Sequence, residues 1–123
     1  MDTVMAREGI RESARKVCER FSEGYWRELD ARREYPEAFI EAMTKSGYLG
    51  ALIPEEYGGL GLSLTETTII LEEINRSGGN AQPAHAQVYV MGTMLRHGSE
   101  QQKREYLPKI ASGQLRPGPT RPP

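Results

Sequence analysis

The sequence predicts an all-α fold, a bundle-like domain of about five helices over residues 1–115 that is followed by a disordered tail over residues 116–123. Two observations predict it. Apolar residues recur at spacings of three and four through most of the chain, which is the period of helices with one buried face. In addition, Ser63 and Ser99 each begin a Ser-x-x-Glu or Ser-x-x-Gln capping box, a pattern typical of a helix start.

The first two predicted helices rest on amphipathic spacing. Residues from about 3 to 21 place apolar side chains every three or four positions between charged ones, and residues from about 35 to 46 repeat the pattern. Pro36 suits the first turn of the second helix, because the N–H that proline lacks is not needed there, and Gly47 suits its exit.

An apolar loop is predicted over residues 48–62. Five of these residues are Gly or Pro, which prevents a regular helix, and most of the others are apolar. Loops of this kind tend to pack against another part of a protein.

The last three predicted helices have clear boundaries. One follows the capping box of Ser63 and runs to about Arg76, and a second begins at Pro83 and runs to about His97. The β-branched residues of this second helix would also tolerate a strand. The third follows the capping box of Ser99, and we expect Pro108 to break it before its end at Gly113.

Composition excludes several classes of function. Sixteen Lys and Arg against seventeen Asp and Glu leave a net charge of -1, whereas nucleic acids and anionic membranes attract a basic excess. The sequence contains no run of about 18 apolar residues, so no membrane span is predicted. Cys18 is the only cysteine, so an intrachain disulfide and a thiolate metal site are excluded. The first residues resemble neither a secretory signal nor a transit peptide, and we expect a cytoplasmic protein.

The chemical groups predict no catalytic residue and no metal site. His97 is interpreted as a helix-end residue that suits the helix dipole, and His85 as a structural or pocket-lining residue. The adjacent carboxylates at 55–56 and 72–73 point in different directions on a helix, so we expect solvated charge rather than an acid/base pair. The sequence contains no Gly-x-Ser-x-Gly motif, so it does not indicate a serine hydrolase.

The glycine-rich turn at 58–61 does not match a nucleotide-binding motif. A Walker loop ends in Gly-Lys-Ser or Gly-Lys-Thr, and a dinucleotide fingerprint needs a preceding strand; this turn has neither. Because it leads into a capped helix, a close backbone approach to a ligand or to another domain stays open.

Taken together, four segments resemble the acyl-CoA dehydrogenase family. They are Ile53-Pro54-Glu55-Glu56-Tyr57-Gly58-Gly59-Leu60-Gly61-Leu62, the preceding helix from Tyr35-Pro36 to Gly47-Tyr48-Leu49-Gly50, Leu71-Glu72-Glu73-Ile74, and Gly98-Ser99-Glu100-Gln101-Gln102 with the residues through Gly113. Their order and spacing match the N-terminal helical domain of that family over about residues 5 to 115.

The resemblance implies a reaction and a place in it. Enzymes of the family bind FAD, abstract an α-proton from an acyl-CoA thioester with a glutamate, and pass the β-hydrogen to the flavin as hydride. The N-terminal domain would supply one wall of the acyl pocket. By position, that wall is expected at Tyr57, Gly58, Gly59 and Leu60 in the loop and at His85, Val88, Tyr89 and Gly92 in the fourth helix.

The sequence departs from the family after residue 115. The family continues into a β-domain that contacts flavin and thioester, whereas this chain turns into Arg116-Pro117-Gly118-Pro119, a pattern that resembles a frameshift or a premature stop. We therefore expect that this chain alone binds no FAD and has no dehydrogenase activity. The alternative is a non-catalytic interaction module that docks on a full-length homologue or another partner. Because members of the family usually form homo-oligomers, the resemblance also implies that this chain could form one.

Overall fold

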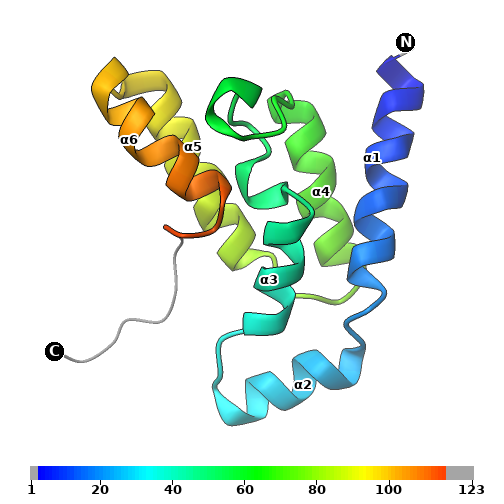
Figure 1. Cartoon of the computed structure of the whole chain (residues 1–123). Helices are drawn as coiled ribbons and strands as arrows, with labels where there is room; N and C mark the ends of the chain where they lie inside the picture. Colours follow the sequence, from blue (N-terminus) through cyan, green and yellow to red (C-terminus); the bar gives the residue numbers. More distant parts are fainter. Residues whose placement is uncertain (1–2, 116–123) are drawn as a thin grey trace, which may run out of the picture.

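The computed structural model describes residues 3–115, and over this range the chain forms six α-helices and two short 3-10 helices. The elements are α1 (Thr3–Cys18), α2 (Glu23–Arg32), α3 (Glu37–Lys45), η1 (Tyr48–Gly50), η2 (Glu55–Tyr57), α4 (Leu64–Arg76), α5 (Gln82–His97) and α6 (Glu100–Ala111). Figure 1 shows α1 beside α4, α5 beside α6, and α2 across one end of the molecule. The predicted all-α fold is therefore confirmed, and the predicted tail at 116–123 lies outside the described residues.

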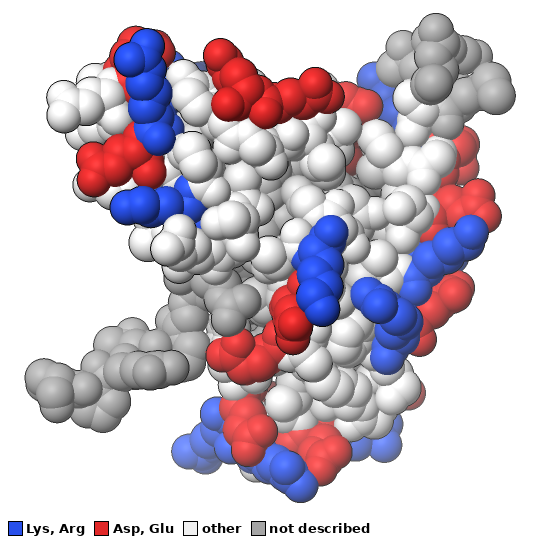
Figure 2. Space-filling model, in the orientation of Figure 1, with Lys and Arg blue, Asp and Glu red and all other residues white. Residues whose placement is uncertain are grey.

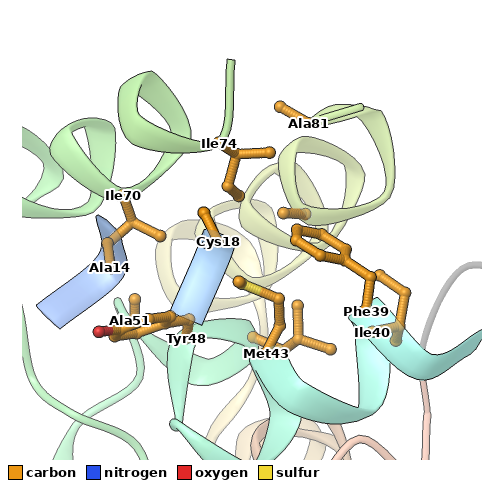
Figure 3. Packing of buried hydrophobic residues seen from close by; sticks show 12 residues of the cluster. Ala14, Cys18, Phe39, Ile40, Met43, Tyr48, Ala51, Ile70, Ile74 and Ala81 are labelled. Atoms are coloured by element: carbon orange, nitrogen blue, oxygen red, sulfur yellow. The ribbon is translucent and has the colours of Figure 1, made fainter. Parts of the chain in front are cut away.

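Two clusters of buried residues hold the helices together. The larger one joins α1, α3, η1 and α4, and Figure 3 shows Phe39, Ile40 and Met43 of α3 beneath side chains from α1 and α4. The smaller one joins the loop after η1 to α5 and α6 and consists of Ile53, Met91, Leu107, Ile110 and Ala111. Because burial of apolar surface is the main stabilising contribution to a small domain, these clusters fix where α5 lies.

Helix α2 was not among the predicted elements. Ser22 caps it by accepting a hydrogen bond from the backbone N–H of Tyr25 at 3.3 Å, and Arg33 ends it in the left-handed region with a φ of 56°. None of its side chains is fully buried, so it lacks the apolar stripe on which periodicity depends. The ring of Trp26 instead packs edgewise on Phe39, with centroids 4.8 Å apart. Tertiary aromatic contacts of this kind leave little periodic signal in the sequence.

The predicted break at Pro108 is wrong. Helix α6 continues through Pro108 to Ala111, although proline cannot donate the backbone hydrogen bond to the preceding turn. Only one turn follows the proline, and its residues Ile110 and Ala111 are buried in the smaller cluster together with Leu107. Burial of these side chains outweighs the loss of one hydrogen bond, which contributes about 1 kcal/mol.

Charges of both signs cover the surface. Figure 2 shows blue and red side chains interspersed over the end formed by α2 and along α1, whereas the middle of this face is mostly uncharged. Five of the described ion pairs join residues four apart on one helix, such as Glu28 with Arg32 and Glu41 with Lys45. Within residues 3–115 no helix is long and apolar enough to cross a membrane.

Candidate functional site

The glycine-rich turn after η2 is closed by its own backbone. Five consecutive N–H groups donate to carbonyl oxygens of the segment 50–55, at distances of 2.8 to 3.2 Å: Gly58 to Glu55, Gly59 to Pro54, Leu60 to Gly50, Gly61 to Ile53 and Leu62 to Ala51. A phosphate group would need N–H groups like these to be unpaired and to point at it. The turn therefore does not form a phosphate cradle.

Glycine is required in this turn for two different reasons. Gly58 and Gly61 have φ values of 90° and 64°, a region that other residues rarely adopt. Gly59 is constrained by space, because a Cβ atom there would lie 2.1 Å from the carbonyl oxygen of Ile53 and 2.6 Å from that of Gly50. The close backbone approach that the sequence left open is thus made to the chain's own loop.

The two residues that flank the glycines also pack within the domain. The side chain of Leu60 lies over Gly47, whose Cβ position is 3.0 Å from a methyl carbon of Leu60. The hydroxyl of Tyr57 donates to the carboxylate of Glu100 at 3.5 Å. The pKa of Tyr57 is raised, mainly because its hydroxyl loses contact with solvent and to a lesser extent because Glu100 and Glu56 are negatively charged. This phenol therefore stays protonated.

Four of the eight predicted wall residues meet in one open groove. His85, Val88, Tyr89 and Gly92 follow one another along α5 at helical spacing and line a groove of about 740 Å³. Leu52 and Leu64 form its other side, and Thr93, Leu95, Arg96 and His97 extend it toward the end of α5. The loop residues 57–60 do not line this groove, so the structure does not bring the two halves of the predicted wall together.

The exposed side of α5 is unusually apolar. Tyr89 is 72% exposed and Val90 45%, and Leu64 at the start of α4 is 65% exposed. A second groove of about 380 Å³ runs beside the first and shares Tyr89, Thr93 and His97 with it. This is the apolar surface in the described part of the chain that a ligand or another protein surface could cover.

The opposite side of α5 is fixed by packing and by one buried amide. Met91 is part of the smaller core cluster, and Gln87 is 1% exposed. The Nε2 of Gln87 donates to the carbonyl oxygens of Ile110 at 3.3 Å and Leu115 at 3.1 Å. This amide ties the middle of α5 to the segment that follows α6, so the groove-lining side chains have a rigid support. The sequence pattern gave no signal for this role of Gln87.

Glu73 corrects the expectation that the carboxylates at 72–73 are solvated. Its side chain is only 2% exposed and accepts a hydrogen bond from Arg11 at 2.9 Å, with Arg15 at 3.7 Å, whereas Glu72 remains on the surface. Helix α4 turns Glu73 toward α1, and two arginines one turn apart on α1 meet it there. This group joins two helices and faces none of the grooves on α5.

The remaining candidate groups are dispersed. His97 lies exposed at the end of α5, where the sequence placed it, and Cys18 is buried beside α4. Burial, partly opposed by a hydrogen bond with Ser77, raises the pKa of the Cys18 thiol. Among the residues that the structure describes, no three His, Cys, Asp or Glu side chains are close enough to hold a metal ion.

Comparison with known proteins gives one consistent result. The model of the family described as "Acyl-CoA dehydrogenase, N-terminal domain" matches residues 6–114. "Probable acyl-CoA dehydrogenase FadE25" of Mycobacterium tuberculosis is 35% identical over 105 residues, which are 84% of this chain and 27% of that protein. The mitochondrial isovaleryl-CoA dehydrogenase of Oryza sativa is 33% identical over 112 residues, and that of Bos taurus is 31% identical over 110. The chain thus spans about a quarter of the length of these relatives.

Proposed function

Because the chain belongs to the acyl-CoA dehydrogenase family and matches its N-terminal domain, we propose that α5 forms one wall of the pocket that receives the acyl chain of a thioester. The observation that carries this proposal is the apolar groove lined by His85, Val88, Tyr89 and Gly92. Its exposed apolar floor suits a hydrocarbon chain, since a pocket for such a ligand is mostly apolar with few polar groups.

The flavin would be held by groups outside the described residues. FAD carries a pyrophosphate, and three places in this helical unit that present backbone N–H groups already use them in contacts within the chain. The glycine turn uses all of its N–H groups internally, and the first turns of α4 and α6 are occupied by the capping boxes of Ser63 with Glu66 and of Ser99 with Gln102. We infer that this chain alone neither retains FAD nor dehydrogenates a thioester.

The visible absorption spectrum of the purified chain tests this inference directly. The expected result is a colourless protein that stays colourless after incubation with FAD and gel filtration, while its helical circular dichroism shows that it is folded. A yellow protein that is bleached by an acyl-CoA would refute the inference.

The wall itself is tested in a chimera. Residues 6–114 would replace the matched segment of the bovine isovaleryl-CoA dehydrogenase, and dehydrogenase turnover would be measured with thioesters of increasing chain length. Gly92→Leu is the informative variant, because a Cβ at Gly92 meets only Leu52, at 3.9 Å, and the longer side chain then projects into the groove. Leucine also favours the helix more than glycine does, so loss of folding is not expected.

In that chimera, Gly92→Leu should lower kcat/KM for the longer thioesters by about tenfold or more, as expected when a well-placed apolar contact is blocked. Gly9→Leu on α1 is the matched control, since nothing lies within 4 Å of its Cβ position, and it should leave kcat/KM unchanged. Equal kcat/KM values for the two variants at every chain length would exclude α5 as the wall.

A second function is favoured by the exposure of Tyr89 and Val90. The chain could act as a non-catalytic module whose α5 face docks on a full-length homologue or on another copy of itself. Light scattering coupled to gel filtration tests this function. A stable dimer that is lost in Tyr89→Ser would support it. A well-folded monomer at about 100 µM, a concentration at which a weak interface would already associate, would count against it.

A further inference from the structure

A separate groove lies between α2 and the turn that joins α4 to α5. It has a volume of about 480 Å³ and shares no lining residue with the two grooves on α5. The half-buried ring of Trp26 and the buried Pro36 line one side, and Gly79 in the turn lines the other. A Cβ at Gly79 would lie only 3.0 Å from the Trp26 ring, so the turn packs closely on the indole. We call this the α2 groove.

The charged side chains of the α2 groove leave an excess of acid. Among the described residues, three carboxylates and one base line it, and the base, Arg27, is bound to Glu23 at 2.7 Å. The other two carboxylates, Asp30 and Glu34, are exposed and form no ion pair in the described part of the chain. Two negative charges beside an aromatic ring favour a ligand that carries cations.

The described chain ends within reach of this groove. The Cβ position of Gly113 lies 2.6 Å from Thr44, near the end of α3, and Pro36 precedes Thr44 by eight residues, about 12 Å at 1.5 Å per residue. Figure 1 shows that α3 leads from this point toward α2. The carbonyl oxygen of Leu115 accepts from Gln87, which lies about 8 Å from the start of α5 by the same rise. Eight further residues in an extended proline-rich conformation span about 25 Å, at 3.1 Å per residue.

The segment 116–123 has the chemistry that complements the groove. It contains four prolines, two arginines and no acidic residue. Proline-rich segments bind aromatic-lined grooves, and an arginine can pair with a carboxylate and stack on an aromatic ring. We propose that residues 116–123 bind in the α2 groove. Their proline rings would contact Trp26, and their two arginines would face Asp30 and Glu34. The segment would then tie α2, which has no buried side chain of its own, to the end of α6.

Trp26 reports on this groove directly, because it is the only tryptophan of the chain. In the whole 123-residue chain, acrylamide quenching of its fluorescence and the NMR resonance of its indole N–H measure how far the ring is covered. Replacing both arginines, as Arg116→Gln with Arg121→Gln, should increase the quenching and shift the indole resonance. Each exposed ion pair that is lost lowers the ratio of bound to unbound segment by up to about fivefold.

Exchange of the charges separates docking from an indirect effect on the fold. Asp30→Lys with Glu34→Lys should uncover the ring, and adding Arg116→Glu with Arg121→Glu to that variant should restore its protection. Because Asp30 and Glu34 are exposed, the helical circular dichroism should not change. Glu105→Lys on α6 is the control, since it reverses an exposed acid that does not line the groove, and it should leave both signals unchanged.

Three results would overturn the proposal: quenching that is insensitive to both arginines, a charge exchange that restores no protection, or protection that rises with chain concentration. A short tether gives an effective concentration in the mM range, so protection within one chain should be equal at about 10 µM and about 100 µM. Protection found only at the higher concentration would assign the groove to the segment of a second copy. These outcomes are independent of the chimera, which reports on α5.

Discussion

Gly59→Ala should destabilise the domain more than its single added methyl group suggests. The new Cβ would lie 2.1 Å from the Ile53 carbonyl oxygen, 2.5 Å from the Ile53 Cβ and 2.6 Å from the Gly50 carbonyl oxygen. Real Cβ atoms stay beyond 3.0 Å of other heavy atoms, and all three neighbours are backbone or Cβ atoms that cannot rotate away. The loop must therefore move as a unit.

The magnitude follows from what such a movement breaks. Overpacking in a tight interior costs about 1–3 kcal/mol. The N–H groups of Leu60 and Gly61 donate across the same contact to Gly50 and Ile53, and each lost hydrogen bond costs about 1 kcal/mol. We expect the free energy of unfolding to fall by about 3 kcal/mol, a large fraction of the 5–15 kcal/mol typical of a small domain.

Urea denaturation followed by circular dichroism at 222 nm measures this loss as a lower midpoint at an unchanged slope. Gly9→Ala is the matched control, because it adds the same methyl group within α1 where nothing lies within 4 Å. Alanine is the better helix former, so Gly9→Ala should stabilise the chain by about 0.5–1 kcal/mol. If Gly59→Ala fell within about 0.5 kcal/mol of the wild type, which is the range of an ordinary surface substitution, the tight contact inferred here would be wrong.

Three further outcomes are expected. Gln87→Leu removes the amide donor to Leu115 and one of two donors to the Ile110 carbonyl oxygen, which also accepts from the N–H of Gly113, so it should lower the free energy of unfolding by about 1–2 kcal/mol and speed amide hydrogen exchange at Leu115. The hydrogen bond from the backbone N–H of Ser63 lowers the pKa of Glu66, so the stability from this cap is present above the ordinary carboxyl pKa and is lost as the pH falls through the lowered value; urea midpoints from pH 7 to 3 should show that loss. Cys18 is buried with a raised pKa, so an aromatic disulfide reagent should react with it about a thousandfold more slowly in the native chain than in denaturant, as for any group reached by unfolding.

The two capping boxes provide an internal control for the acid effect. Gln102 completes the box at α6 with the geometry that Glu66 has at α4, but its amide does not titrate in this range. Glu66→Gln should therefore remove the acid-dependent part of the stability, while Gln102→Glu should introduce one at α6. A wild-type chain whose stability relative to Glu66→Gln stayed constant from pH 7 to 3 would contradict the assignment.

Sequence reasoning succeeded where local chemistry decides the structure. The boxes at Ser63 and Ser99 specify the starts of α4 and α6, because both partners of each box lie within four residues. It failed where distant contacts decide. Helix α2 is held by the packing of Trp26 on Phe39, and α6 continues through Pro108 because Ile110 is buried against α5.

The candidate site shows the same division. The spacing of His85, Val88 and Gly92 places them on one side of a helix, and in the structure all three line one groove; that this groove is the wall of an acyl pocket stays a prediction. The direction of the loop residues at 57–60 depends on five backbone hydrogen bonds that no residue pattern encodes. The burial of Glu73 was hidden for a related reason, since its arginine partners lie about sixty residues away on α1.

The shape of the groove is set by residues of this chain. Helix α5 is held from behind by Met91 in a cluster with Ile53 and Leu107, and by the amide of Gln87, so the position of the helix that carries the groove is fixed by contacts within this chain. Inactivity of the isolated chain would then come from the lack of groups facing the groove and not from a collapsed wall. The expected result is that the isolated chain gives a helical circular dichroism spectrum and stays colourless with FAD, and that the chimera containing it is active. If grafting restored no activity while the fold persisted, the wall would have to lie on another face.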